Sequence, residues 1–255
     1  MAAIQEALTG PAPVAVARPS VSLGVRRLGV WIAVAGWASM LLMWLTGSAE
    51  VFGHDQEGIS APLGIGLFLI GWLAMVAGMM MPSSLPTLGR VDRVLPAGAD
   101  SAGSRFMLGY FLSWGLFGAA AFAGDAILHL AVEGLPWVAE RPSLILGGAA
   151  MFAGAAELLG RTPPPTLPEI RPEAGAYATG NAHAVDRIRR CWPLMLFAMA
   201  VGMTSPVWMV GLTLLMALEL RPRASAALRL AGLVLFGLGV AVIFEPGWMP
   251  VLFGR

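Results

Sequence analysis

The sequence predicts an all-α fold: a polytopic bundle of about six transmembrane helices with both termini in the cytoplasm. Two observations predict it. Of 255 residues, 57% are hydrophobic and only 12% are charged, a composition typical of integral membrane proteins. The hydrophobic residues also gather in segments of about 20 residues, the length that an α-helix needs to cross a bilayer. We therefore expect a multi-pass protein of the inner (plasma) membrane, surrounded by the lipid bilayer.

The same composition excludes several classes of protein. The single cysteine, Cys191, rules out a disulfide framework within one chain. The 16 basic residues nearly balance the 15 acidic ones, so no nucleic-acid partner is indicated. No phosphate-binding glycine loop, nucleophile with a base partner, or haem ligand set stands out. We therefore predict that the protein is not an enzyme.

The chain divides into a tail, one membrane domain and a second tail. Residues 1–25 contain prolines and show no hydrophobic period, so we predict a disordered N-terminal tail. A single transmembrane helical domain is expected over 26–245, followed by a C-terminal tail, 246–255. The first helix should run from Leu28 to Leu45. Its apolar stretch is longer than that of a signal peptide, which favours a membrane span.

Prolines mark the expected ends of the next two helices. The second helix is predicted from Pro62 to Met81, and Pro82 is expected to break it because proline lacks a backbone N–H. The third is predicted to begin near Phe106 and to continue through Glu133, with an amphipathic last part. Pro136 should end it.

Small residues characterise the fourth helix, which is expected from Ser143 to Leu159. Its pairs of small residues at four-residue spacing, such as Ala150 and Gly154, allow another helix to approach closely inside a bilayer. A polar cytoplasmic loop, 161–190, should follow. Three consecutive prolines stand near its start, and we predict that the rest of it is irregular.

The fifth helix is expected from Cys191 to Leu218, with a kink near Gly202 because Pro206 removes one backbone donor. The sixth should run from Ala226 to Phe244. Arginine is concentrated in the tails and in the second and fourth loops, which places these segments inside by the positive-inside rule. The link between the fifth and sixth helices disagrees, since this topology puts its arginines outside (Arg221, Arg223, Arg229).

Methionine and cysteine form the first candidate site, a metal site. Met75, Met79 and Met80 lie at the end of the second helix, and Cys191 and Met195 lie at the start of the fifth. Thioether and thiolate sulfurs are ligands that soft ions such as Cu(I) prefer. The alternative is that methionine only fills gaps in an apolar core, since its side chain adapts easily.

A charged residue inside a helix forms the second candidate. Glu157 lies within the fourth helix, about one turn before Arg161. A carboxylate inside a span usually faces the bundle interior or water, which makes it a functional candidate. An ion pair at the membrane interface is the other interpretation. A solute or proton carrier that uses Glu157 has no support from an inverted repeat.

The third candidate lies near the end of the third helix. Asp125 and His129 share one helical face with Glu133, because they are spaced by four residues. An imidazole with carboxylates can bind Zn or Cu(II), provided that the first loop with His54 and Asp55 folds onto it. Solvated charges at the end of an amphipathic helix would give the same pattern.

Three sequence motifs, one on each of three predicted helices, resemble the motifs of a known family. The first, W-x-x-M-x-x-A-M-M-x-P-S, matches Trp72–Ser83 with Gly78 in the alanine place, and the second, G-Y-x-x-x-W, matches Gly109–Trp114. The third, C-W-x-L-M followed by a glycine and W-M, matches Cys191–Met209. Over Ala61 to Gly239 the chain resembles the predicted metal-binding integral membrane proteins grouped as domain of unknown function 2182.

The resemblance implies a helical membrane fold and a bound metal, but the chain departs from the family pattern. Family members often carry several more cysteines in the loop before the fifth helix. Here that loop has none, and Arg187 and Arg190 stand where cysteines would be expected. The resemblance therefore supports the fold more strongly than the metal.

Together these observations predict a membrane protein that binds or passes a soft transition metal, with copper as the leading candidate. The alternative is a non-catalytic accessory or structural subunit of a larger membrane complex. Such a subunit would dock on a membrane-protein partner, or on a second copy, through small-residue helix faces and tryptophan-rich rims.

Overall fold

The computed structural model describes residues 23–52, 61–94, 100–160, 175–203, 205–218 and 225–248. Within these ranges the regular structure is entirely helical, as predicted, and contains no strand. Most of the predicted N-terminal tail, the part of the first loop with His54 and Asp55, and Arg221 with Arg223 lie outside the described residues. The α-helices are α2 (Leu23–Leu45), α3 (Ala61–Val94), α4 (Asp100–Glu133), α5 (Pro136–Ala139), α6 (Pro142–Leu159), α7 (Gly175–Val201), α8 (Pro206–Leu218) and α9 (Ser225–Phe244).

Five of the described helices are long and apolar enough to cross a membrane, and they lie in α2, α3, α4, α6 and α9. This confirms the prediction of a helical protein with several segments that are long and apolar enough to span a membrane. The expected fifth helix is not among them. The first half of α7 is polar, and α8 has only 13 residues.

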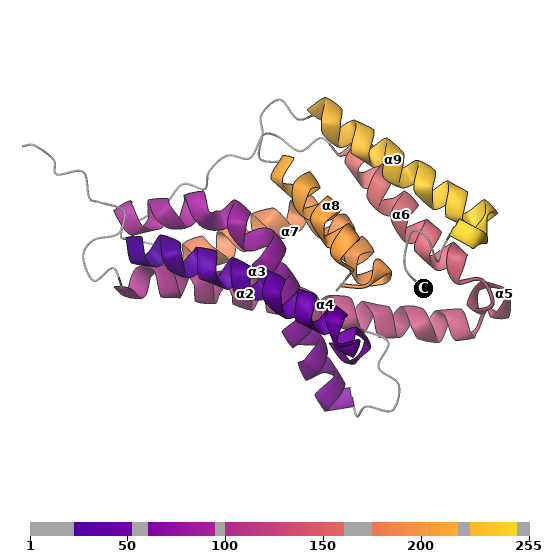
Figure 1. The fold of residues 1–255 in the computed structure, drawn as a ribbon, viewed down its shortest axis with the longest axis horizontal. Helices are drawn as coiled ribbons and strands as arrows, with labels where there is room; N and C mark the ends of the chain where they lie inside the picture. The colour runs from indigo at the N-terminus through magenta and orange to yellow at the C-terminus, as the bar shows by residue number, and fades with distance from the viewer. Residues whose placement is uncertain are drawn as a thin grey trace, which may run out of the picture.

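The prediction that Pro82 breaks the second helix is wrong. Helix α3 continues through Pro82 and Pro86 to Val94, although Figure 1 shows that its two halves run in different directions. Proline at position 82 leaves the carbonyl of Gly78, four residues earlier, without its helical donor. The indole Nε1 of Trp37 on α2 donates to that carbonyl at 3.1 Å. A donor from another helix therefore replaces the missing bond.

The prediction of an irregular loop over 161–190 is wrong for its second half, because α7 already begins at Gly175. Residues 161–174 lie outside the described part of the chain. The polar first half of α7 is helical because it packs along α4, with Thr179, His183 and Arg187 all buried. Tertiary packing stabilises this helix more than its own hydrophobicity does.

The predicted kink near Gly202 is a complete break between two helices. Helix α7 ends at Val201, Gly202 has a φ of 108°, and α8 begins at Pro206. A positive φ is open to glycine at no steric cost. Proline suits the first position of a helix, where its missing N–H would have no helical partner. The expected single helix from Cys191 to Leu218 is therefore two helices.

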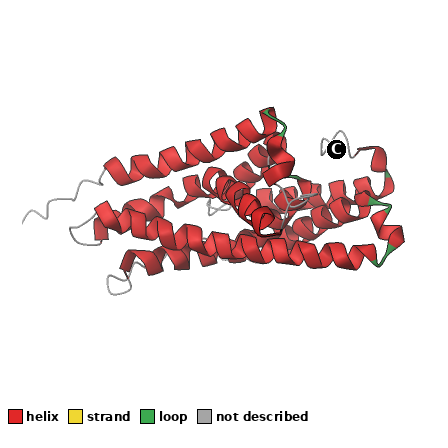
Figure 2. Cartoon of the chain, turned by 90° about the horizontal axis from the view of Figure 1, so that it is seen from below, coloured by secondary structure: helices red, strands yellow, loops and turns green. Residues whose placement is uncertain are grey.

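Glycines bring the helices together in three pairs, α2 with α3, α4 with α7, and α6 with α9 (Figures 1 and 2). In the last pair a Cβ on Gly154 would lie 2.5 Å from the Gly232 carbonyl oxygen, and one on Gly239 would lie 2.5 Å from the Gly147 carbonyl oxygen. Backbones that approach so closely leave no room for side chains. The close approach expected from the small residues of α6 is confirmed.

The α6–α9 contact gives a first prediction. Gly154→Ala should lower the free energy of unfolding by about 1–3 kcal/mol, because the new methyl group meets backbone atoms of α9 that cannot rotate away. Gly148→Ala is the matched control on the same helix, since a Cβ there meets nothing within 4 Å. Denaturant unfolding in detergent should separate the two variants. Equal stability of both would contradict the packing described here.

Candidate metal centre

Buried polar side chains meet where α3, α4 and α7 come together. Ser84 comes from α3, Tyr110 from α4, and His183 and Arg187 from α7. The exposed fraction of each is at most 7%, and that of Arg187 is only 2%. Burying polar groups is costly unless they have partners, so such a cluster calls for an explanation.

Four-residue spacing places these side chains on facing stripes. On α7 the stripe is His183, Arg187, Cys191 and Met195, and on α4 it is Phe106, Tyr110, Trp114 and Gly118. Residues four apart lie one above the other on a helix. Because α4 and α7 pack along each other, the two stripes form opposite walls of the cluster.

Two contacts tie α7 to α3. The Nε2 of His183 lies 3.2 Å from the Oγ of Ser84, and the Nη2 of Arg187 lies 4.0 Å from the Sδ of Met80. From the first contact to the second, the residue number rises by four on α7 and falls by four on α3. The two helices therefore run antiparallel here, with matched turns.

Aromatic rings close the cluster. The Tyr110 ring stacks on the His183 ring with centroids 5.8 Å apart, and Phe106 lies 6.0 Å from the same imidazole. One turn further along, Trp72 Nε1 donates to the Trp114 carbonyl oxygen at 2.9 Å and so joins α3 to α4. This hydrogen bond thus joins a tryptophan of the first sequence motif to a tryptophan of the second.

The Tyr110 hydroxyl lies beside the side chains of Ser84 and Trp114. Nδ1 of His183 is buried and has no hydrogen-bond partner among the described residues. Burial, together with the nearby charge of Arg187, lowers the pKa of His183 to about 4. The imidazole is therefore neutral near pH 7, and one of its ring nitrogens carries a lone pair.

All five predicted metal ligands are buried in the same core. Met75, Met79, Met80, Cys191 and Met195 each have an exposed fraction of 2% or less. Met80 contacts the Arg187 side chain, and Cys191 Sγ donates to the Arg187 carbonyl oxygen at 3.0 Å. The first contact joins α7 to α3, whereas the second lies within one turn of α7.

The chemistry of the donors limits which metal fits. The described residues contain no group of three or more His, Cys, Asp and Glu side chains placed to hold a metal ion. Hard and borderline divalent ions prefer such carboxylate, imidazole and thiolate groups. Thioethers, one thiol and one neutral imidazole remain, and this set suits Cu(I).

The other candidates lie elsewhere. His129 Nδ1 is 3.2 Å from Asp125 Oδ2, which confirms that the two residues share a face of α4, and Glu133 is exposed. Asp125 lies about 22 Å along the axis from Tyr110, so it does not belong to the buried cluster. Glu157 is half-buried on α6, beside Gly232 of α9. Its expected partner Arg161 lies outside the described residues.

Sequence reasoning did not single out Ser84 or His183. The signal was present, because the four-residue series of Met195 and Cys191 continues backward through Arg187 to His183. It was missed because these residues fall in a segment interpreted as an irregular loop. Ser84 follows the proline that was expected to end its helix.

The low pKa of His183 gives a second prediction, since this residue lies outside the five apolar spans. Its folded pKa of about 4 is below the ordinary 6.5, so the unfolded state binds the proton more tightly. Stability should fall as the pH drops below 6.5, by up to about 3 kcal/mol near pH 4. Unfolding measured from pH 7 to 4.5 tests this. His183→Gln, which still reaches Ser84, should lose that part of the pH dependence, and an unchanged profile would refute the assignment.

Comparison with known proteins gives one match. The family model PpoB2, described as a copper chaperone, matches residues 69–242, which is more than half of the chain. No curated protein and no solved structure matches it. The matched range contains the α3, α4 and α7 residues of the buried cluster. The chain belongs to the PpoB2 copper chaperone family.

Proposed function

We propose that this protein is a membrane copper carrier that binds Cu(I) as cargo between α3 and α7 and passes it on. The proposed ligands come from Met75, Met79 and Met80 on α3 and from Cys191 and Met195 on α7. The observation that carries the proposal is that all five are buried in one core, where Met80 on α3 contacts the Arg187 side chain on α7.

The antiparallel register supports this ligand set. Ser84 pairs with His183, and Met80 pairs with Arg187 one turn away. Cys191 follows Arg187 by one turn of α7, and Met79 directly precedes Met80 on α3. Two or three soft sulfur ligands suffice for Cu(I).

The surroundings favour a monovalent ion. Cu(I) bound to a Cys191 thiolate forms a neutral pair, because binding displaces the thiol proton. The guanidinium of Arg187 is a fixed positive charge beside this place. A divalent ion would add a further positive charge in a buried site, which is unfavourable in a medium of low dielectric constant.

The same proposal includes the membrane in which the protein lies, its topology and the role of its sequence motifs. We place the protein in the inner membrane with both termini in the cytoplasm, on the basis of its arginine distribution. This topology requires a sixth crossing, by α7 or α8, in addition to the five apolar spans. We also propose that the motifs resembling domain of unknown function 2182 are the metal-binding motifs of the copper chaperone family, since they fall within the matched residues. On this topology the Met80 end of the first half of α3 faces the cytoplasm.

A non-catalytic accessory subunit remains the second candidate. Several tryptophans are more than half exposed, as a docking surface would require (Trp31, Trp44, Trp137, Trp248). The small residues of α6, however, are used within the chain against α9. Purification in mild detergent tests this candidate, because a stoichiometric membrane partner together with no bound copper would favour it over the carrier.

Copper binding itself gives a third prediction. Purified protein under reducing conditions should withdraw Cu(I) from a coloured Cu(I) chelator. Met79→Leu, Met80→Leu and Cys191→Ser should each weaken binding by at least about tenfold, because each removes a soft ligand while nearly keeping the side-chain volume.

Met151→Leu is the matched control for that experiment. Met151 packs against Gly239 of α9, in a different helix pair, so its replacement should leave Cu(I) affinity unchanged. The carrier proposal fails if the protein takes no Cu(I) from the chelator, or if the control variant loses as much affinity as the variants in α3 and α7.

A further inference from the structure

The geometry points to a second soft-metal site, in the cavity between α2, the bend of α3 and the start of α8. There Met40 and Met209 would hold a Cu(I) ion beside the ring of Trp37. This inference rests on the proposed function, because it names a place where copper is held before it reaches the ligands between α3 and α7. Met40 lies outside the three sequence motifs.

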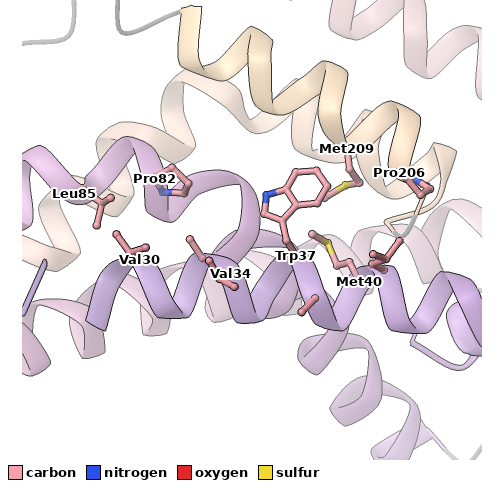
Figure 3. A pocket seen from close by; sticks show the side chains of 11 residues that line it. Val30, Val34, Trp37, Met40, Pro82, Leu85, Pro206 and Met209 are labelled. Atoms are coloured by element: carbon pink, nitrogen blue, oxygen red, sulfur yellow. The ribbon is translucent and has the colours of Figure 1, made fainter. Parts of the chain in front are cut away.

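The cavity has a volume of about 690 Å³ and apolar walls. Figure 3 shows it with Trp37 and Met40 from α2, Pro82 and Leu85 from α3, and Pro206 and Met209 from α8. None of its lining residues is charged, and its walls offer no carboxylate or imidazole. A hydrated divalent ion therefore finds no ligand there, whereas thioethers bind a soft monovalent ion without any charged group.

Trp37 fixes one side of the proposed site. Its indole Nε1 donates to the Gly78 carbonyl, which holds the ring in place. Met40 lies against the same glycine, because a Cβ on Gly78 would meet the Met40 methyl at 2.8 Å and Trp37 Cδ1 at 3.3 Å. The Met40 methyl and the Nε1–Cδ1 edge of the Trp37 indole are thus both placed at Gly78.

Met209 supplies the second thioether from another helix. Figure 3 shows its side chain reaching from α8 toward the Trp37 ring, with the Met40 side chain nearby. Both methionines line the cavity although the exposed fraction of each is at most 3%. Two thioethers from separate helices that face one space are a minimal ligand pair for Cu(I).

The site adjoins the proposed carrier ligands. Gly78, which contacts Met40 and Trp37, directly precedes Met79 and Met80. The cavity therefore lies against the turn of α3 from which Met80 reaches Arg187. An ion that leaves Met40 and Met209 needs to pass only this turn to reach Met79 and Met80.

NMR of the full-length protein labelled with [methyl-¹³C]methionine tests the site, with Ag(I) as a redox-inert substitute for Cu(I). The methyl signals of Met40 and Met209, assigned from Met40→Leu and Met209→Leu, should shift on addition of Ag(I). Each substitution should remove the shift of the other methionine and lower the bound Ag(I) by about one ion per protein. Met151→Leu is the control and should change neither.

The outcomes separate this inference from the proposed function. In the variant Met79→Leu/Met80→Leu/Cys191→Ser the shifts of Met40 and Met209 should persist. If only the methionines of α3 and α7 respond, the second site is wrong and the carrier proposal stands. If no methionine responds, both are wrong. If a lipid with a spin-labelled acyl chain broadens the Met40 signal and Ag(I) leaves it unchanged, the cavity holds an acyl chain and the inference is overturned.

Discussion

The arrangement of α2, α3 and α8 depends on the hydrogen bond that Trp37 donates to the carbonyl of Gly78. Pro82 gives α3 its bend and leaves this carbonyl without a helical donor. Inside a membrane an unpaired backbone carbonyl costs several kcal/mol. The indole of Trp37 satisfies it, and the absence of a side chain at Gly78 lets α2 come close enough to do so. One bond therefore fixes the bend, the α2–α3 pair and the wall of the cavity together.

The buried cluster between α3, α4 and α7 follows from the same bend. Because α3 continues beyond Pro82 as a helix, Ser84 is presented to His183 one turn after Met80 meets Arg187. Tyr110 and Trp114 close the cluster from α4, and the Trp72 bond to the Trp114 carbonyl fixes their height. Residues of all three sequence motifs thus lie in one buried core.

The positions of α2, α4, α6 and α9 were predictable, because a continuous apolar stretch marks each of them. The two wrong predictions, a helix break at Pro82 and an irregular loop before Cys191, have a common cause, since both depend on contacts with another helix. Trp37, which satisfies the carbonyl freed by Pro82, lies 41 residues before Gly78, so no local pattern shows it. The polar start of α7 is helical because α4 buries it. For the candidate site, Met80 and Cys191 were proposed from their chemistry, whereas Ser84 and His183 required knowledge of which helices touch.

The first half of α7 is polar and the second half is apolar, so this helix depends on its neighbours for burial. Its first half carries His183 and Arg187, so this helix gains little by entering a bilayer alone. It is buried only because α4 offers a matching groove, where Gly109 and Gly180 allow the backbones to touch. Five helices are long and apolar enough to cross a membrane by themselves, whereas α7 depends on α4, which precedes it in the chain, to bury its polar half. The cluster that contains Met80, Tyr110 and Cys191 therefore forms only when α7 packs against α4.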